Sequence, residues 1–106
     1  MSADTFRVAL SAGFRSTDGA LTYPSFDLSP ISDATGIEMY FLPPGDPVRA
    51  QDLDNADALI LLSERFSAES IPASGKLSVV ARFGVGYDTV DVSACSKNNI
   101  AVCITP

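Results

Sequence analysis

Apolar residues in this chain gather in five short runs, and the stretches between them are rich in glycine, proline, serine and aspartate. Short apolar runs bounded by such turn residues are typical of buried strands. The run 58–62 is apolar without interruption, as expected for a central parallel strand that is covered on both faces. The pattern predicts strands over residues 6–10, 37–42, 58–62, 77–81 and 100–104.

The segments between the predicted strands carry signals for short helices. Asp46 precedes Pro47, an arrangement typical of a helix in which the aspartate caps the first turn and the proline takes the first helical position. Asp91 is a candidate cap for the last helix, and Asn99 tolerates the left-handed backbone that ends a helix. These signals predict helices over residues 31–35, 48–55, 67–71 and 92–98.

The alternation of strands and short helices predicts the fold. Such strands pair in parallel through right-handed crossovers. We therefore expect an α/β domain with a five-stranded parallel open sheet of the flavodoxin-like (Rossmann-like, three-layer) type and strand order 2-1-3-4-5. The 106 residues suffice for one domain, 1–106, and almost nothing follows the last strand. Because a helix usually follows such a strand, we expect a truncated domain with one poorly covered sheet face.

The charge balance argues against several classes of partner. The net charge is −6, from 13 acidic and 7 basic side chains. Nucleic acids and anionic membrane surfaces both require a basic face, so neither is expected as a partner. The first residues lack the regions of a secretory signal, and the apolar runs are too short to span a bilayer. The default expectation is a soluble cytoplasmic protein.

The chain is poor in residues that hold metals or move protons. It contains two cysteines, Cys95 and Cys103, and no histidine. We expect both cysteines to be small buried apolar side chains rather than a disulfide or a metal pair. With these few ligands a metal site is not expected. The absence of histidine also removes the commonest general acid–base group.

The segment 82–91 is the most informative part of the sequence. Two glycines follow a predicted strand, where they allow a tight bend and a close approach to a ligand. The N–H groups of Val85 and Gly86 would then point at an anion, and a small carboxylate suits such a cradle. The carboxyl end of the neighbouring strand carries Ser63 and Arg65. The candidate substrate-binding residues are Phe83, Gly84, Val85, Gly86, Ser63 and Arg65.

Other interpretations of these residues stay open. A dinucleotide fingerprint needs a third glycine, but Thr89 occupies its place. On the loop alone, glycines chosen for a tight turn are the favoured interpretation. Ser63 has no base to activate it, and Arg65 is interpreted more simply as a solvated surface side chain.

Three segments of the second half resemble the amino-terminal domain of D-isomer-specific 2-hydroxyacid dehydrogenases, of which D-3-phosphoglycerate dehydrogenase is a member. The resemblance is specific in the run Gly84-Val85-Gly86-Tyr87-Asp88, followed by Asp91 and by a strand that ends in Thr105-Pro106. It covers the chain well from about residue 56 onward. The segments are 57–61, 76–91 and 100–106.

The resemblance implies a flavodoxin-like substrate-binding domain joined to a Rossmann domain that holds NAD or NADP. It implies hydride transfer between nicotinamide and a 2-oxo or 2-hydroxy acid, with Val85 and Gly86 offering N–H groups to the substrate carboxylate. The family's catalytic arginine, histidine and acidic residue belong to later parts of the chain, so no catalytic or cofactor-binding residue is assigned here. We expect the isolated chain to be inactive and to bind no cofactor. Some relatives carry an arginine near Leu62, so phosphoglycerate is not assigned as the substrate.

Two hypotheses from other functional classes remain open. The first is a non-catalytic small-molecule-binding or protein-interaction module of flavodoxin-like fold, and a homodimer stays open. The second is a flavin-binding flavodoxin relative, for which the segment 11–17 is only a faint phosphate loop. In the main interpretation the partners are a small 2-oxo or 2-hydroxy acid and the missing nucleotide-binding domain.

Overall fold

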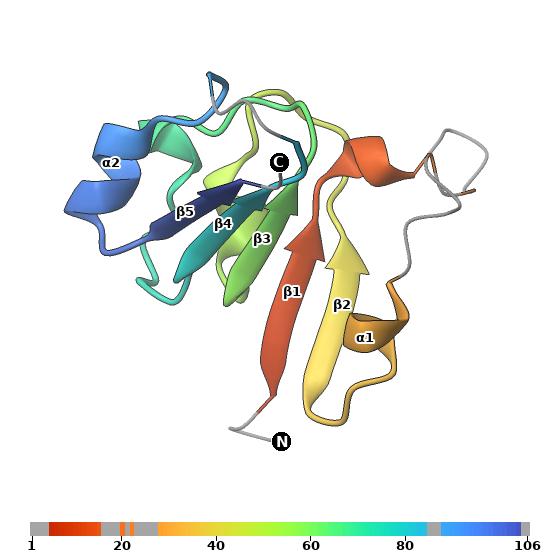
Figure 1. Ribbon diagram of the computed structural model, residues 1–106. Helices are drawn as coiled ribbons and strands as arrows, with labels where there is room; N and C mark the ends of the chain where they lie inside the picture. Colours follow the sequence, from red (N-terminus) through yellow and green to blue (C-terminus); the bar gives the residue numbers. More distant parts are fainter. Residues whose placement is uncertain (1–4, 16–19, 21, 23–27, 85–87, 105–106) are drawn as a thin grey trace.

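The computed structural model describes residues 5–15, 20, 22, 28–84 and 88–104. Five strands and five short helices, three of them 3₁₀ helices labelled η, follow one another along this part of the chain (Figure 1). They are β1 (Phe6–Leu10), η1 (Ala12–Phe14), α1 (Ser29–Ser32), β2 (Ile37–Phe41), η2 (Ala50–Leu53), β3 (Ala58–Leu61), η3 (Ala68–Ser70), β4 (Val79–Arg82), α2 (Val92–Lys97) and β5 (Ala101–Ile104).

All five strands lie in one parallel sheet with the order β2-β1-β3-β4-β5. This order confirms the predicted α/β fold and the predicted strand order 2-1-3-4-5, in which the direction of winding reverses between β1 and β3. In the register, Leu10 lies opposite Phe41 on one side and opposite Ile60 on the other. The carboxyl ends of the strands therefore meet along one edge, which is the edge where ligands bind in open α/β sheets.

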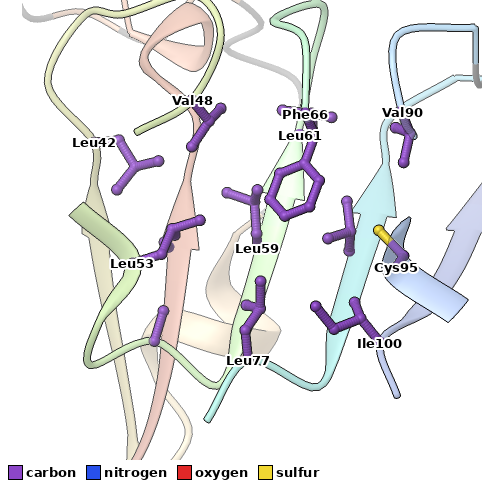
Figure 2. Close-up of a cluster of buried hydrophobic side chains, with 13 residues drawn as sticks. Leu42, Val48, Leu53, Leu59, Leu61, Phe66, Leu77, Val90, Cys95 and Ile100 are labelled. Atoms are coloured by element: carbon purple, nitrogen blue, oxygen red, sulfur yellow. The ribbon is translucent and has the colours of Figure 1, made fainter. Parts of the chain in front are cut away.

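One face of the sheet carries the larger hydrophobic cluster (Figure 2). The strand residues Leu59, Leu61 and Val80 are fully buried there. Leu53 from η2 and Cys95 from α2 pack into the same cluster. Alternate strand positions face this layer, as the two-residue period of a strand requires.

The opposite face carries a smaller cluster, built on Val8, Leu10 and Ala58 and covered by Phe14 and Leu28. The coverage fades toward β5. Ala101 and Cys103 lie opposite Val79 and Ala81 of β4 in the register, and both β5 residues are exposed. The expectation of one poorly covered sheet face is thus confirmed along β5.

The cysteine expectations have different outcomes. Cys95 is buried as predicted, and its burial, with Asp91 nearby, raises the pKa of its thiol. Cys103 is exposed, so its predicted burial is wrong: it lies on the edge strand β5, where Ala101 on the same face is exposed as well. Both thiols are free.

The last predicted helix forms as expected because its capping residue lies next to it in the sequence, whereas the other predicted helices are shifted or shorter. The Asp91 side chain accepts a hydrogen bond from the Ala94 N–H (3.0 Å) and caps α2, and Asn99 adopts a φ of 59° after that helix. The predicted helix 31–35 forms earlier, at Ser29–Ser32, with Pro30 in its first turn. The predicted 67–71 helix is one 3₁₀ turn that begins after Ser67.

The predicted helix 48–55 is a short 3₁₀ helix, and Asp46 does not cap it. Instead, the Asp46 carboxylate accepts the N–H of Arg65 at 2.9 Å. For Asp46, a contact with a distant part of the chain thus overrides the local signal. The predicted strand 77–81 begins later, at Val79, and Leu77 just before it is buried.

Within the described residues, no helix combines the length and the apolar character needed to cross a membrane.

Candidate functional site

The candidate site lies at the carboxyl edge of the sheet, where hydrogen bonds join the residues that follow the strands. The Ser11 N–H donates to the carbonyl of Ile60 (3.0 Å), and the Ser11 hydroxyl accepts from the N–H of Leu62 (3.0 Å). The Phe83 N–H donates to the carbonyl of Leu61 (2.7 Å). The ends of β1, β3 and β4 therefore form one continuous framework below the loop that carries Gly84.

Gly84 has the backbone conformation that the sequence predicted for a tight bend. Its φ is +138°, a backbone conformation that residues with a side chain rarely adopt. A Cβ at this position would also overlap Nη1 of Arg82. The positive φ favours glycine at the point where β4 turns into the loop, and a Cβ there would also require the guanidinium of Arg82 to move. Val85 and Gly86, the two predicted N–H donors, lie outside the described residues.

Two contacts hold the residues just before the bend. The guanidinium of Arg82 donates a hydrogen bond to the Phe83 carbonyl. The Phe83 ring packs edge-to-face on Phe14 of η1, with the ring centroids 5.5 Å apart and an angle of 76° between the planes. Edge-to-face ring pairs are favourable beyond the apolar area that they bury. The start of the candidate loop is thus fixed by its own strand and by the turn after β1.

Ser63 and Arg65, the other two predicted site residues, lie in the segment that follows β3. Ser63 is exposed. Arg65 is exposed too, and its Nε pairs with Oδ1 of Asp46 at 3.1 Å. Hydrogen bonds from the backbone and side chain of Arg65 lower the pKa of the Asp46 carboxyl. The proposed contact of either residue with a substrate stays a prediction.

Sequence reasoning missed Glu64, the residue between these two. Its carboxylate accepts the N–H of Gly13 (2.7 Å) and the N–H of Ser63 (3.2 Å). Gly13 lies 51 residues earlier in the chain. The only signal in the sequence is a glycine just after one strand and an acidic residue just after the strand that lies beside it.

The described residues do not fit a bound dinucleotide. Thr89 takes the place of the third glycine, and its carbonyl accepts the N–H of Phe66 (2.8 Å), so that this turn is already part of the internal packing. The helix that follows, α2, has only six residues. Among the described residues, no group of three or more histidine, cysteine, aspartate and glutamate side chains is placed to hold a metal ion.

A separate hollow of about 250 Å³ lies at the opposite edge of the sheet. Its lining includes Leu77 and Ile100, which precede β4 and β5. The residues that line it are Ala68, Ile71, Pro72, Ala73, Gly75, Leu77, Asn98 and Ile100. None of these side chains titrates, so the hollow offers no acid–base chemistry.

Comparison with curated proteins finds archaeal relatives named glyoxylate reductase. The relative from Korarchaeum cryptofilum is 40% identical over 65 residues, which are 60% of this chain and 20% of the relative. The relative from Thermococcus kodakarensis is 42% identical over 53 residues, 49% of this chain and 16% of the relative. The matched segments therefore span a fifth or less of the length of these relatives.

Comparison with solved structures supports the fold. The NAD+-bound 3-phosphoglycerate dehydrogenase of Entamoeba histolytica matches with a TM-score of 0.75 and 23% identity, over 96% of this chain and 33% of that one. The NAD-dependent formate dehydrogenase of Staphylococcus aureus, in complex with NAD, matches with a TM-score of 0.69 and 24% identity, over 96% and 31%.

A family model covers most of the chain and includes the candidate loop. Residues 31–106 match the model described as D-isomer specific 2-hydroxyacid dehydrogenase, catalytic domain. This match agrees with the resemblance that runs from about residue 56 through Gly84 to the end of the sequence. The chain belongs to the D-isomer specific 2-hydroxyacid dehydrogenase family.

Proposed function

We propose that this chain is the substrate-binding part of an NAD(P)-dependent oxidoreductase that interconverts D-2-hydroxy acids and 2-oxo acids. The substrate carboxylate is bound by backbone N–H groups of the loop from Gly84 to Gly86. The observation that carries the proposal is the bend at Gly84, where the backbone has a positive φ. The bend lies at the edge of the sheet where ligands bind in open α/β folds, and the chain belongs to this family.

The described residues suit binding and orientation rather than the chemical step. Two or three N–H donors bind a carboxylate well, and they carry no proton that titrates near neutral pH. Arg65 places a guanidinium, paired with Asp46, in the segment that follows β3, and the Ser63 hydroxyl is a further hydrogen-bonding group. We assign hydride and proton transfer to groups in a nucleotide-binding domain outside this chain, as the family resemblance implies.

The substrate class is a small 2-oxo acid. Curated relatives that match the segment include proteins named glyoxylate reductase. Leu62 is apolar and partly buried at the end of β3, so this position offers no charge to a phosphate group. A short acid such as glyoxylate or pyruvate therefore suits the edge better than a phosphorylated one.

The test is a titration of the ¹⁵N-labelled chain with pyruvate, followed by the amide chemical shifts of Gly84, Val85 and Gly86. We expect saturable shifts at these amides. Pyruvamide is the matched neutral control, because it keeps the shape of pyruvate and removes its charge, and it should cause no such shift. Equal shifts with both compounds, or shifts confined to another part of the chain, contradict the proposal.

The exposed residues of β5 favour a second candidate, a non-catalytic interaction module. Ile104 is 40% exposed and Cys103 is exposed on the strand at the edge of the sheet. An exposed apolar edge strand is a surface that commonly pairs with another chain. A tight dimer in solution, combined with no response to pyruvate, would favour this module over the binding of an acid.

A further inference from the structure

The turn η1 lies between Glu64 and the start of the candidate loop. On one side, the Glu64 carboxylate accepts the Gly13 N–H at 2.7 Å. On the other side, Phe14, the next residue in the chain, packs its ring on Phe83. A short path of contacts therefore leads from Glu64 through Gly13, Phe14 and Phe83 to Gly84.

The link between Glu64 and Gly13 is close and depends on glycine. A hydrogen bond from an N–H to a carboxylate is shorter and stronger than one to a neutral oxygen. A Cβ on Gly13 would lie 3.1 Å from Oε2 of Glu64 and 3.1 Å from Cδ2 of Leu62. The absence of a side chain at position 13 lets the carboxylate approach the backbone.

The remaining links are well packed. Phe14 is 1% exposed, so its ring has no freedom to move away from Phe83 without opening the smaller core cluster. The Phe83 N–H is bonded to the carbonyl of Leu61. A displacement of η1 would therefore move the backbone at Phe83 and Gly84, because Phe83 is held both by the Phe14 ring and by its hydrogen bond to Leu61.

We propose that Glu64 is a positioning residue for the bend at Gly84, where the candidate carboxylate-binding loop begins. It acts through η1: its carboxylate fixes Gly13, and the ring pair of Phe14 and Phe83 carries this constraint to Gly84. The part of the proposal that concerns the backbone at Phe83 and Gly84 stands on these contacts alone. The part that concerns ligand affinity rests on the proposed function.

The first variant is Glu64→Gln. A glutamine has nearly the same shape, but its single acceptor oxygen cannot serve both N–H donors, and its NH₂ group would face one of them. The Gly13 carbonyl still accepts from the Thr22 hydroxyl (2.7 Å), which helps the variant to fold. The matched control is Asp57→Asn, because the Asp57 carboxylate accepts a backbone N–H from Arg7 (2.8 Å) just before β3, at the opposite edge of the sheet.

The measurement is hydrogen exchange at the amide of Phe83, which donates to the carbonyl of Leu61, in the chain without ligand. We expect exchange at this amide to be about tenfold faster in Glu64→Gln and unchanged in Asp57→Asn, as the loss of a charge-assisted hydrogen bond implies. Gly13→Ala crowds the Glu64 carboxylate and the Leu62 side chain, each 3.1 Å from the new Cβ, so it should accelerate exchange at the same amide and serves as the test if Glu64→Gln does not fold. Unchanged exchange in both site variants overturns the proposal.

A pyruvate titration separates this proposal from the proposed function. If the unmodified chain binds pyruvate and Glu64→Gln binds it about tenfold more weakly, both proposals are supported. Equal binding by the two proteins overturns the positioning role of Glu64 and leaves the proposed function intact. If the unmodified chain does not bind pyruvate, the proposed function fails, and the exchange rate of the Phe83 amide still decides whether Glu64 positions the bend.

Discussion

The guanidinium of Arg82 occupies the space into which a Cβ on Gly84 would project. The same guanidinium donates a hydrogen bond to the carbonyl of Phe83, the residue between them. Arg82, the last residue of β4, thus limits which residue fits at position 84. Position 84 is restricted twice, by this neighbour and by its own φ of +138°.

Gly84→Ala should therefore destabilise the chain and weaken the response of the loop to pyruvate. We expect a loss of about 2 kcal/mol in the free energy of unfolding, since a strained backbone conformation adds to the displacement of Arg82. Urea unfolding measures the loss. The control is Gly36→Ala, because Gly36 also has a positive φ (85°) but nothing lies within 4 Å of its Cβ position. A loss at Gly84 no larger than the loss at Gly36 would contradict this account of the bend.

Phe14→Leu tests the ring contact between η1 and the loop. The substitution keeps an apolar side chain but removes the edge-to-face pair with Phe83. Such a ring pair contributes about 1 kcal/mol beyond the apolar area that it buries. We expect a modest loss of stability together with changed amide shifts at Gly84. Phe66→Leu is the control, because Phe66 is an equally buried ring in the other cluster. It should cost similar stability and leave the Gly84 amide unchanged; identical shifts in the two variants would argue against the contact.

The predicted strands and their order are confirmed, for a reason that lies in the residues themselves. Parallel strands that are covered on both faces have continuous apolar sequences, and residues 58–62 form such a run. The cap of α2 was also predictable, because Asp91 and its partner Ala94 are only three residues apart. These features depend on neighbours in the sequence.

What the sequence did not show depends on partners far along the chain. Asp46 resembles a helix cap, but its carboxylate is engaged by Arg65, 19 residues later. Glu64 is an ordinary loop residue in the sequence, and only the pairing of β1 with β3 brings it to Gly13. The bend at Gly84 was predicted, whereas the turn that supports it was not.

The pair formed by Asp46 and Arg65 predicts an effect of acid on stability. The pKa of Asp46 in the folded chain is below its ordinary value of 3.8, because Arg65 donates hydrogen bonds to the ionised carboxylate. A carboxyl whose pKa is lowered by folding stabilises the fold above its ordinary pKa, and this contribution is lost as the pH falls below 3.8.

Asp46→Asn should accordingly be less stable than the unmodified chain at pH 7, and the difference should shrink as the pH falls below about 4. Thermal unfolding midpoints of the two proteins across this range measure the effect. A gap that stays constant or widens toward low pH would show that the ionised carboxylate does not contribute through this pair.

The chain alone should not turn over substrate. A mixture of the 106-residue chain, NADH and glyoxylate should show no loss of absorbance at the nicotinamide band beyond a blank without protein, because the chain has no histidine and the described residues do not fit a nucleotide. The matched segment is 20% of the length of the Korarchaeum cryptofilum relative, and under the proposed function hydride and proton transfer are assigned to groups outside this chain. NADH oxidation in proportion to the concentration of the chain would contradict this division of roles.

The most direct test of the central claim is a crystal structure of the chain with pyruvate bound. The account predicts that the carboxylate lies against the loop after β4, with its oxygens about 3 Å from the backbone nitrogens of Val85 and Gly86. A structure in which these two N–H groups are bonded within the protein, with pyruvate bound elsewhere, would contradict it.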